Sequence, residues 1–181
     1  MLDTARLRLK LPEPGQARIM LRFRQENRDF LEPWEPLRPA DFYTGGYWRL
    51  QLQRNLQEFR QGTSVCLSLM DHEESEVLGV CNYTNIVRGT FQACHLGYAL
   101  AERHQGKGYM FEALEAANAY IFEELRLHRI MANYMPHNER SGDLLKRLGF
   151  KVEGRADKLL RINGRWEDHV LTAKVNPADP D

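Results

Sequence analysis

The segment from Thr63 to Leu125 places the strongest constraint on what this chain can fold into. Three runs with strand-like composition follow one another across short polar turns, at 63–69, 77–83 and 91–100. This spacing favours an antiparallel meander. Apolar residues then recur with a helical period from about Gly108 to Leu125. The segment therefore predicts three paired strands, with one long helix leaving the third.

The segments on either side show either the two-residue period of a strand or the helical period. Arg6–Leu11 alternates apolar and basic residues, which is typical of a half-buried strand. Asn163-Gly164 is the strongest short hairpin signal, so we expect a strand pair around it. Asn27–Pro39 reads as a loop. The other predicted elements are helices at 17–23, 47–60 and 141–148, and strands at 130–135 and from Phe150. This order predicts an α/β or α+β fold with a mixed sheet.

Length and composition bound the class of protein. The 181 residues, 43% of them hydrophobic, suit one domain over 1–181, with a core at about 4–175 and a frayed tail at 176–181. Lys+Arg and Asp+Glu both number 25, which argues against a general electrostatic grip on nucleic acid or acidic membranes. Apolar runs are far shorter than the roughly 20 residues that a membrane span needs. Sparse cysteines and the lack of an apolar signal segment predict a cytoplasmic protein.

The first candidate site is Arg103-His104-Gln105-Gly106-Lys107-Gly108, between the third meander strand and the long helix. Glycines let several backbone N–H groups converge, and a helix start adds partial positive charge, so an anion can be held there. The segment is not a Walker loop, and Phe111 breaks the dinucleotide-binding pattern. An ordinary glycine-containing turn remains the alternative interpretation.

The second candidate site is Pro136-His137-Asn138-Glu139-Arg140-Ser141, between a predicted strand and a short helix. Ser141 is well placed as the helix N-cap, and Asn138 suits a local turn. Either role is purely structural. If the two strand ends lie side by side, however, Asn138 and the glycine loop line one cleft.

Aromatic residues and carboxylates supply the remaining candidates. The region 30–48 either forms a wall over a bound substrate or only covers the open end of the sheet. We favour a mixture of these two roles. Its aromatic residues are Trp34, Phe42, Tyr43, Tyr47 and Trp48. The glutamates of the long helix, among them Glu112 and Glu115, are interpreted as its solvated face.

Together these motifs resemble the GNAT family of acetyl-CoA-dependent N-acetyltransferases. The resemblance lies in Arg103-x-x-Gly106-x-Gly108 opening a helix, then Asn138-x-x-Ser141 and Leu148-Gly149-Phe150. Further segments resemble the Rim subfamily, which acetylates the N-termini of ribosomal proteins. These segments are Thr4-Ala5-Arg6-Leu7, Glu32-Pro33-Trp34-Glu35-Pro36, Gln105-Gly106-Lys107-Gly108-Tyr109-Met110 and Met135-Pro136-His137-Asn138. The run 129–138 is especially similar to Rim enzymes that act on an N-terminal alanine, and the resemblance covers about 4–175.

The resemblance implies a mixed, largely antiparallel sheet with helices on both faces and two parallel strands that splay apart. Those strands would be the one ending near Leu100 and the one at 129–135. The acetyl-pantetheine arm of acetyl-CoA would lie in the gap and satisfy unpaired backbone groups. The pyrophosphate would sit on the amides of 103–108, with charge added by Arg103 and Lys107. The implied cofactor-binding residues are Leu100, Arg103, Gln105, Gly106, Lys107, Gly108, Met110, Asn138 and Ser141, and no metal is expected.

The implied reaction is direct attack of a neutral amine on the thioester. At pH 7, neutralising an α-amine of pKa near 8 costs roughly 1.4 kcal/mol, against about 4.6 kcal/mol for a lysine. A modest base is therefore enough for an N-terminal substrate. Glu35 is the leading candidate for this base, with Asp157 and Glu102 behind it. An equally weighted alternative is that Glu35 is only a solvated or salt-bridged carboxylate of its loop. Ser141 would protonate the departing thiolate, with Tyr134 as another nearby hydroxyl.

The implied function is acetyl transfer to the N-terminal α-amine of a ribosomal protein by a monomer or homodimer, without nucleic-acid or membrane partners. Two alternatives stay open from the sequence. One is an acetyltransferase for a small amine, such as an aminoglycoside, a polyamine or an amino acid. The other is a non-catalytic ribosome-assembly module that keeps the cofactor groove.

Overall fold

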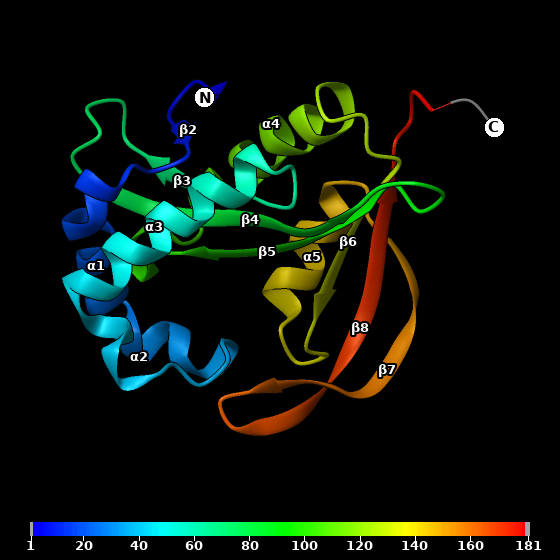
Figure 1. Cartoon of the computed structure of the whole chain (residues 1–181). Coiled ribbons are helices and arrows are strands. Elements are labelled where there is room, and N and C mark those ends of the chain that lie inside the picture. The colour runs from blue at the N-terminus through cyan, green and yellow to red at the C-terminus, as the bar shows by residue number, and fades with distance from the viewer. Residues whose placement is uncertain (1, 180–181) are drawn as a thin grey trace.

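One eight-stranded sheet organises the chain, with strand order β1-β2-β3-β4-β5-β6-β8-β7 (Figure 1). The computed structural model describes residues 2–179. The strands are β1 (Leu2–Asp3), β2 (Arg8–Lys10), β3 (Val65–Met70), β4 (Val77–Val87), β5 (Ala93–Leu100), β6 (Arg129–Tyr134), β7 (Lys151–Ile162) and β8 (Arg165–Val175). Neighbouring strands are antiparallel except for β5 and β6, which are parallel. The predicted meander is confirmed as β3-β4-β5.

Helices cover both faces of this sheet, as predicted. They are α1 (Ala17–Glu26), α2 (Arg28–Leu31), α3 (Gly45–Arg60), α4 (Tyr109–Glu123) and α5 (Glu139–Arg147), with 3-10 turns at Pro14–Gln16, Glu32–Trp34, Ala40–Tyr43 and Glu102–His104. None of the helices in residues 2–179 combines the length and apolarity that crossing a bilayer requires.

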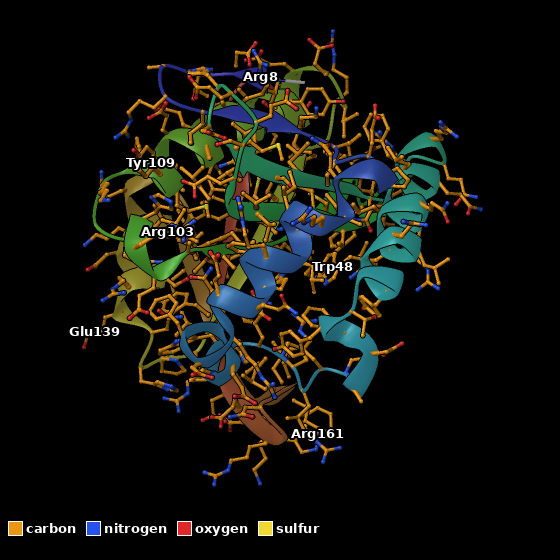
Figure 2. The ribbon with its side chains drawn as sticks, turned by 90° about the vertical axis from the view of Figure 1, so that its left-hand side faces the viewer. Arg8, Trp48, Arg103, Tyr109, Glu139 and Arg161 are labelled. Atoms are coloured by element: carbon orange, nitrogen blue, oxygen red, sulfur yellow. The ribbon has the colours of Figure 1, made fainter. Side chains whose placement is uncertain are left out.

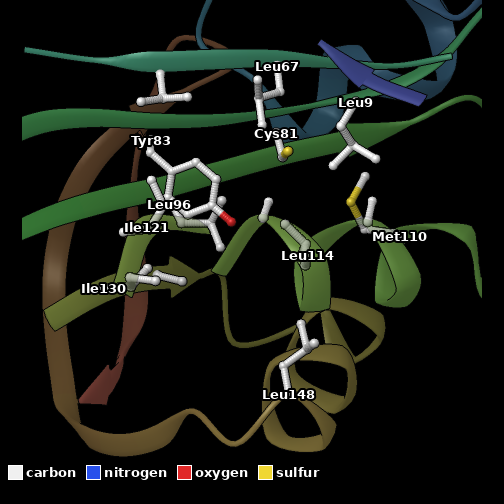
Figure 3. Close-up of a cluster of buried hydrophobic side chains, with 14 of the residues drawn as sticks. Leu9, Leu67, Cys81, Tyr83, Leu96, Met110, Leu114, Ile121, Ile130 and Leu148 are labelled. Carbon is white, nitrogen blue, oxygen red and sulfur yellow. The ribbon is translucent and has the colours of Figure 1, made fainter. Parts of the chain in front are cut away.

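Two apolar clusters form the core, one on each face of the sheet. The larger packs α4 and α5 against the strands, and includes Leu114, Ile121 and Ile130 (Figure 3). The smaller cluster packs α1 and α3 against the opposite face. Alternation along β4 divides its residues between them, since Val80 joins the smaller cluster and Cys81 the larger.

The hairpin between β7 and β8 confirms the Asn-Gly signal. Asn163 and Gly164 have φ of 42° and 80°, so both occupy the left-handed region that a two-residue turn of this kind needs. β7 is irregular at Ala156–Leu160, where the pairing with β8 shifts.

Two local predictions are wrong. The predicted loop at Asn27–Pro39 contains α2 and a 3-10 turn before its extended end. Residues 176–179 are bound rather than frayed, because Asn176 N–H donates to the His128 carbonyl (2.8 Å) and His128 Nδ1 lies 2.6 Å from Asp179 Oδ2. Residues 180–181 lie outside the described part of the chain.

Candidate active site

The parallel strands β5 and β6 pair over only three residues and then separate. Their register runs from Ala93↔Arg129 to His95↔Met131, although β5 continues to Leu100 and β6 to Tyr134. The outer edges stay paired, β5 with β4 and β6 with β8. Figure 1 shows the two strands diverging. The facing edges beyond His95 and Met131 can therefore accept an extended ligand that carries amide groups, which is the arrangement that the family resemblance implied.

The glycine loop joins the end of β5 to α4 and leaves a row of free donors. Gly106 and Gly108 have φ of 73° and 79°, which L side chains rarely adopt. Within residues 2–179, the backbone N–H groups of 106–111 have no hydrogen-bond acceptor, and no side chain caps α4. Six successive free amides at a helix N-terminus form an anion-binding site.

This row is shifted from the predicted one. The N–H groups of His104 and Gln105 donate to the carbonyls of Ala101 (3.0 Å) and Glu102 (3.1 Å), since they close a 3-10 turn. The prediction that the amides of 103–108 form the row is therefore wrong at these two positions. The Gln105 side chain instead donates to the Leu100 carbonyl (2.9 Å) and ties the loop to the strand end.

The charges of the loop are also distributed differently from the prediction. Arg103 donates to Glu26 (2.9 Å) and to Glu76, so two carboxylates balance its guanidinium. Lys107 is exposed and forms no ion pair within the described residues. Figure 2 places Arg103 and Tyr109 at the same side of the molecule. Leu100 and Met110 are buried in the core, so they can offer a ligand only their backbone.

Asn138, and not Ser141, caps α5. The Asn138 Oδ1 accepts a hydrogen bond from the Ser141 N–H (3.2 Å), and the helix begins at Glu139. The predicted N-cap role of Ser141 is wrong, because the helix begins two residues before the predicted start at 141 and Asn138 precedes it. Ser141 therefore lies in the first turn, with its hydroxyl free for another partner.

That partner is Tyr98 of β5, which sequence reasoning missed. The hydroxyl oxygens of Tyr98 and Ser141 lie 2.7 Å apart, and either can donate. Burial raises the pKa of Tyr98 to about 12, although the hydrogen bond to Ser141 opposes this, so the Tyr98 phenol keeps its proton at neutral pH. The pair links the separated part of β5 to α5. Alternation along β5 places Tyr98 on the same face as Cys94 and Leu96, and this was the available signal.

Tyr134, the other predicted acid, packs against α5. Its ring carbons and hydroxyl lie 2.9–3.0 Å from the position that a Cβ on Gly142 would occupy. This contact makes Gly142 a spacer between β6 and α5.

Glu35 is held between two arginines. Its Oε1 accepts from Arg24 (2.8 Å) and its Oε2 from Arg38 (2.7 Å). Burial alone would raise the pKa of Glu35, but the charges and hydrogen bonds of Arg24 and Arg38 together hold it below the ordinary value. A carboxylate with both oxygens engaged is a poor base, so these contacts favour the salt-bridged reading. Arg24 is itself buried against aromatic rings, and its guanidinium lies 5.4 Å from the Trp48 ring centroid.

The other predicted bases are more exposed. Asp157 is 87% exposed, in the irregular part of β7. Glu102 is exposed as well, and its backbone N–H donates to Oδ1 of the buried Asn27 (2.9 Å). Asn27 fixes the end of β5 from the loop before α2, and sequence reasoning missed it.

The loop at 31–39 covers the far end of the gap. The Trp34 ring lies 5.5 Å from the His137 ring, and the Asn163 N–H donates to the Glu35 carbonyl (2.9 Å). A cavity of about 200 Å³ lies beneath this loop, lined in part by Arg28, Arg38 and Tyr43. Phe42 and Trp48 are buried, whereas Trp34 is 38% exposed. Within residues 2–179, no group of three His, Cys, Asp or Glu side chains could hold a metal ion.

Comparison with known proteins gives consistent matches. The family model for the acetyltransferase (GNAT) domain matches residues 6–151. The [ribosomal protein uS5]-alanine N-acetyltransferase of Escherichia coli K12 is 48% identical over 97% of this chain and 91% of its own. The ribosomal-protein-S5-alanine acetyltransferase of Vibrio fischeri has a TM-score of 0.94 at 37% identity, covering 99% and 98% of the two chains. Mycobacterium smegmatis RimJ in complex with CoA-disulfide has a TM-score of 0.89 at 27% identity, covering 98% and 88%.

Proposed function

Since this chain belongs to the GNAT acetyltransferase family, we propose that it transfers the acetyl group of acetyl-CoA to the N-terminal α-amine of a ribosomal protein that begins with alanine. The observation that supports this choice of acceptor substrate is the 48% identity to a uS5-alanine N-acetyltransferase, because the identity extends over 97% of the chain. It therefore includes the loop at 31–39 and the β7–β8 hairpin as well as the cofactor loop.

Two features of the fold support acetyl-CoA as the donor. The free amides of 106–111 suit its pyrophosphate, and the unpaired edges of β5 and β6 suit the amides of its pantetheine arm. CoA lies in the homologous M. smegmatis structure. In this proposal Gly106, Lys107, Gly108 and Met110 contribute backbone N–H groups, and Asn138 and Ser141 line the thioester end.

The chemistry follows from this placement. The neutral α-amine attacks the thioester carbonyl carbon, an N–C bond forms, the C–S bond breaks, and the nitrogen gives up one proton while the thiolate takes up one. Ser141 is the proposed donor to the thiolate, and Tyr98 holds its hydroxyl in place. An α-amine of pKa near 8 loses its proton at a cost of roughly 1.4 kcal/mol at pH 7. Water is then a sufficient acceptor, and Glu35 is not needed as the base.

Intact-mass measurement of unacetylated uS5 incubated with the protein and acetyl-CoA tests the proposal. One added acetyl group on the N-terminal alanine is the expected result. The matched control is the same uS5 with its first residue blocked, which should gain nothing. If uS5 stays unmodified while a polyamine or an amino acid is acetylated, the small-amine alternative replaces this proposal.

A further inference from the structure

The N-terminal segment Thr4–Leu7 is bound to the first turn of α4. The Thr4 hydroxyl donates to Glu112 Oε1 (2.7 Å), and the Arg6 backbone N–H donates to the same oxygen (2.8 Å). The Arg6 Nε donates to Glu112 Oε2 (2.6 Å). The interpretation of Glu112 as part of a solvated face is therefore wrong, since its side chain is only 18% exposed.

Arg6 also reaches the glycine loop itself. Its Nη1 donates to the carbonyl of Lys107 (2.8 Å), and its guanidinium lies 4.4 Å from the Tyr109 ring centroid. These contacts join one side chain to the residues immediately before and after Gly108.

The contact at Lys107 orients a peptide unit. The Lys107 carbonyl and the Gly108 N–H belong to one planar trans peptide, so they point in opposite directions. When Arg6 holds the carbonyl toward itself, the Gly108 N–H faces away from Arg6. That N–H is one of the six free donors. The glycines on either side of Lys107 would otherwise let this peptide turn over easily.

We propose that Arg6, held by Glu112, is a positioning residue that fixes the amides of the glycine loop for the pyrophosphate of acetyl-CoA. The inference rests on the proposed donor substrate and adds a specific residue outside the loop. The physical gain is preorganisation, since a loop fixed in its binding conformation loses less freedom when the ligand binds.

Arg6→Gln, with Arg8→Gln as the matched control, tests this inference. Arg8 lies two residues on and pairs with Asp3 and Glu74 instead of the loop. The probes are acetyl-CoA and S-acetylpantetheine, which lacks the pyrophosphate, with an N-terminal alanine peptide as acceptor. Arg6→Gln should lower kcat/KM for acetyl-CoA about tenfold, the loss of roughly one charged hydrogen bond. It should leave S-acetylpantetheine nearly unchanged, and Arg8→Gln should affect neither substrate.

Binding of CoA measured by calorimetry gives an independent readout, and Glu112→Gln provides a second variant if Arg6→Gln folds poorly. Both variants should weaken CoA binding and leave the KM for the peptide nearly unchanged. Equal losses with both thioesters, or unchanged CoA affinity in both variants, would overturn the inference. Wild-type protein that fails to bind CoA would instead overturn the proposed donor, and this inference with it.

Discussion

At the scale of single residues, the hydroxyl pair of Ser141 and Tyr98 is the part of the site most open to test. We expect Ser141→Ala to lower kcat about a hundredfold, because the leaving thiolate loses its proton donor, while KM for acetyl-CoA changes little. Tyr98→Phe keeps the Ser141 hydroxyl and should cost less. Steady-state kinetics with an alanine-initiated peptide measures both. A wild-type kcat in Ser141→Ala would move the donor role to Tyr134 or water, which Tyr134→Phe then separates.

At the scale of elements, the spacing between β6 and α5 depends on Gly142. A helix interior usually gains up to about 1 kcal/mol when glycine becomes alanine. A Cβ at Gly142, however, would lie 2.9 Å from two ring carbons of Tyr134. Gly142→Ala should therefore lower the free energy of unfolding by about 1 kcal/mol. Gly46→Ala in α3 is the matched control, since its Cβ would meet nothing within 4 Å, and it should stabilise. Urea unfolding measures the free energy of unfolding of both variants. Equal stabilisation by both would contradict the spacer role of Gly142, because α5 would then shift away from Tyr134 at no cost.

At the scale of the whole molecule, acid should destabilise the fold. Ion pairs and hydrogen bonds lower the pKa of five carboxyl groups, Glu35, Asp71, Glu74, Glu112 and Asp168. Each contributes stability that is present above its unfolded pKa, about 4, and is lost as pH falls through its lower folded pKa. We therefore expect the unfolding free energy in urea titrations to decline slightly below about pH 6.5, because burial lowers the pKa of His95, and to fall more steeply below about pH 5, where the carboxyl groups begin to lose their contribution.

Part of this acid effect can be assigned to Glu35, because Glu35 pairs with the buried Arg24. Glu35→Gln should lower the unfolding free energy at pH 7 by about 3 kcal/mol, since the charge of Arg24 is left unpaired. The difference from wild type should shrink as pH falls below the unfolded pKa of about 4 toward the lowered pKa of Glu35 in the fold. Glu115→Gln, on the exposed face of α4, serves as the control. A Glu35→Gln variant as stable as wild type at pH 7 would contradict the role of Glu35 as the stabilising partner of Arg24.

Local patterns were enough for the features that depend on neighbours in sequence. The meander, the long helix, the Asn-Gly hairpin and the glycine loop each follow from period, turn chemistry or backbone conformation. The family that these motifs predicted is confirmed by the match over residues 6–151. The assignments of Glu35 and Glu112 could not be made in this way, because the partners of Glu35 lie on α1 and on its own loop, and those of Glu112 lie in the N-terminal segment.

The sequence by itself therefore determined the order of the main elements and the residues of the glycine loop, and its resemblance to the family implied the divergent strands. Only the tertiary structure decided which groups meet: Tyr98 with Ser141, Arg6 with the Lys107 carbonyl, and Glu35 with two arginines. The physical reason is that periodicity and turn preference act over a few residues, whereas hydrogen bonds and ion pairs depend on three-dimensional distance. Asn138 is an example, since the sequence placed it in a local turn and Ser141 at the N-cap, whereas the structure begins α5 at Glu139 with Asn138 as its cap.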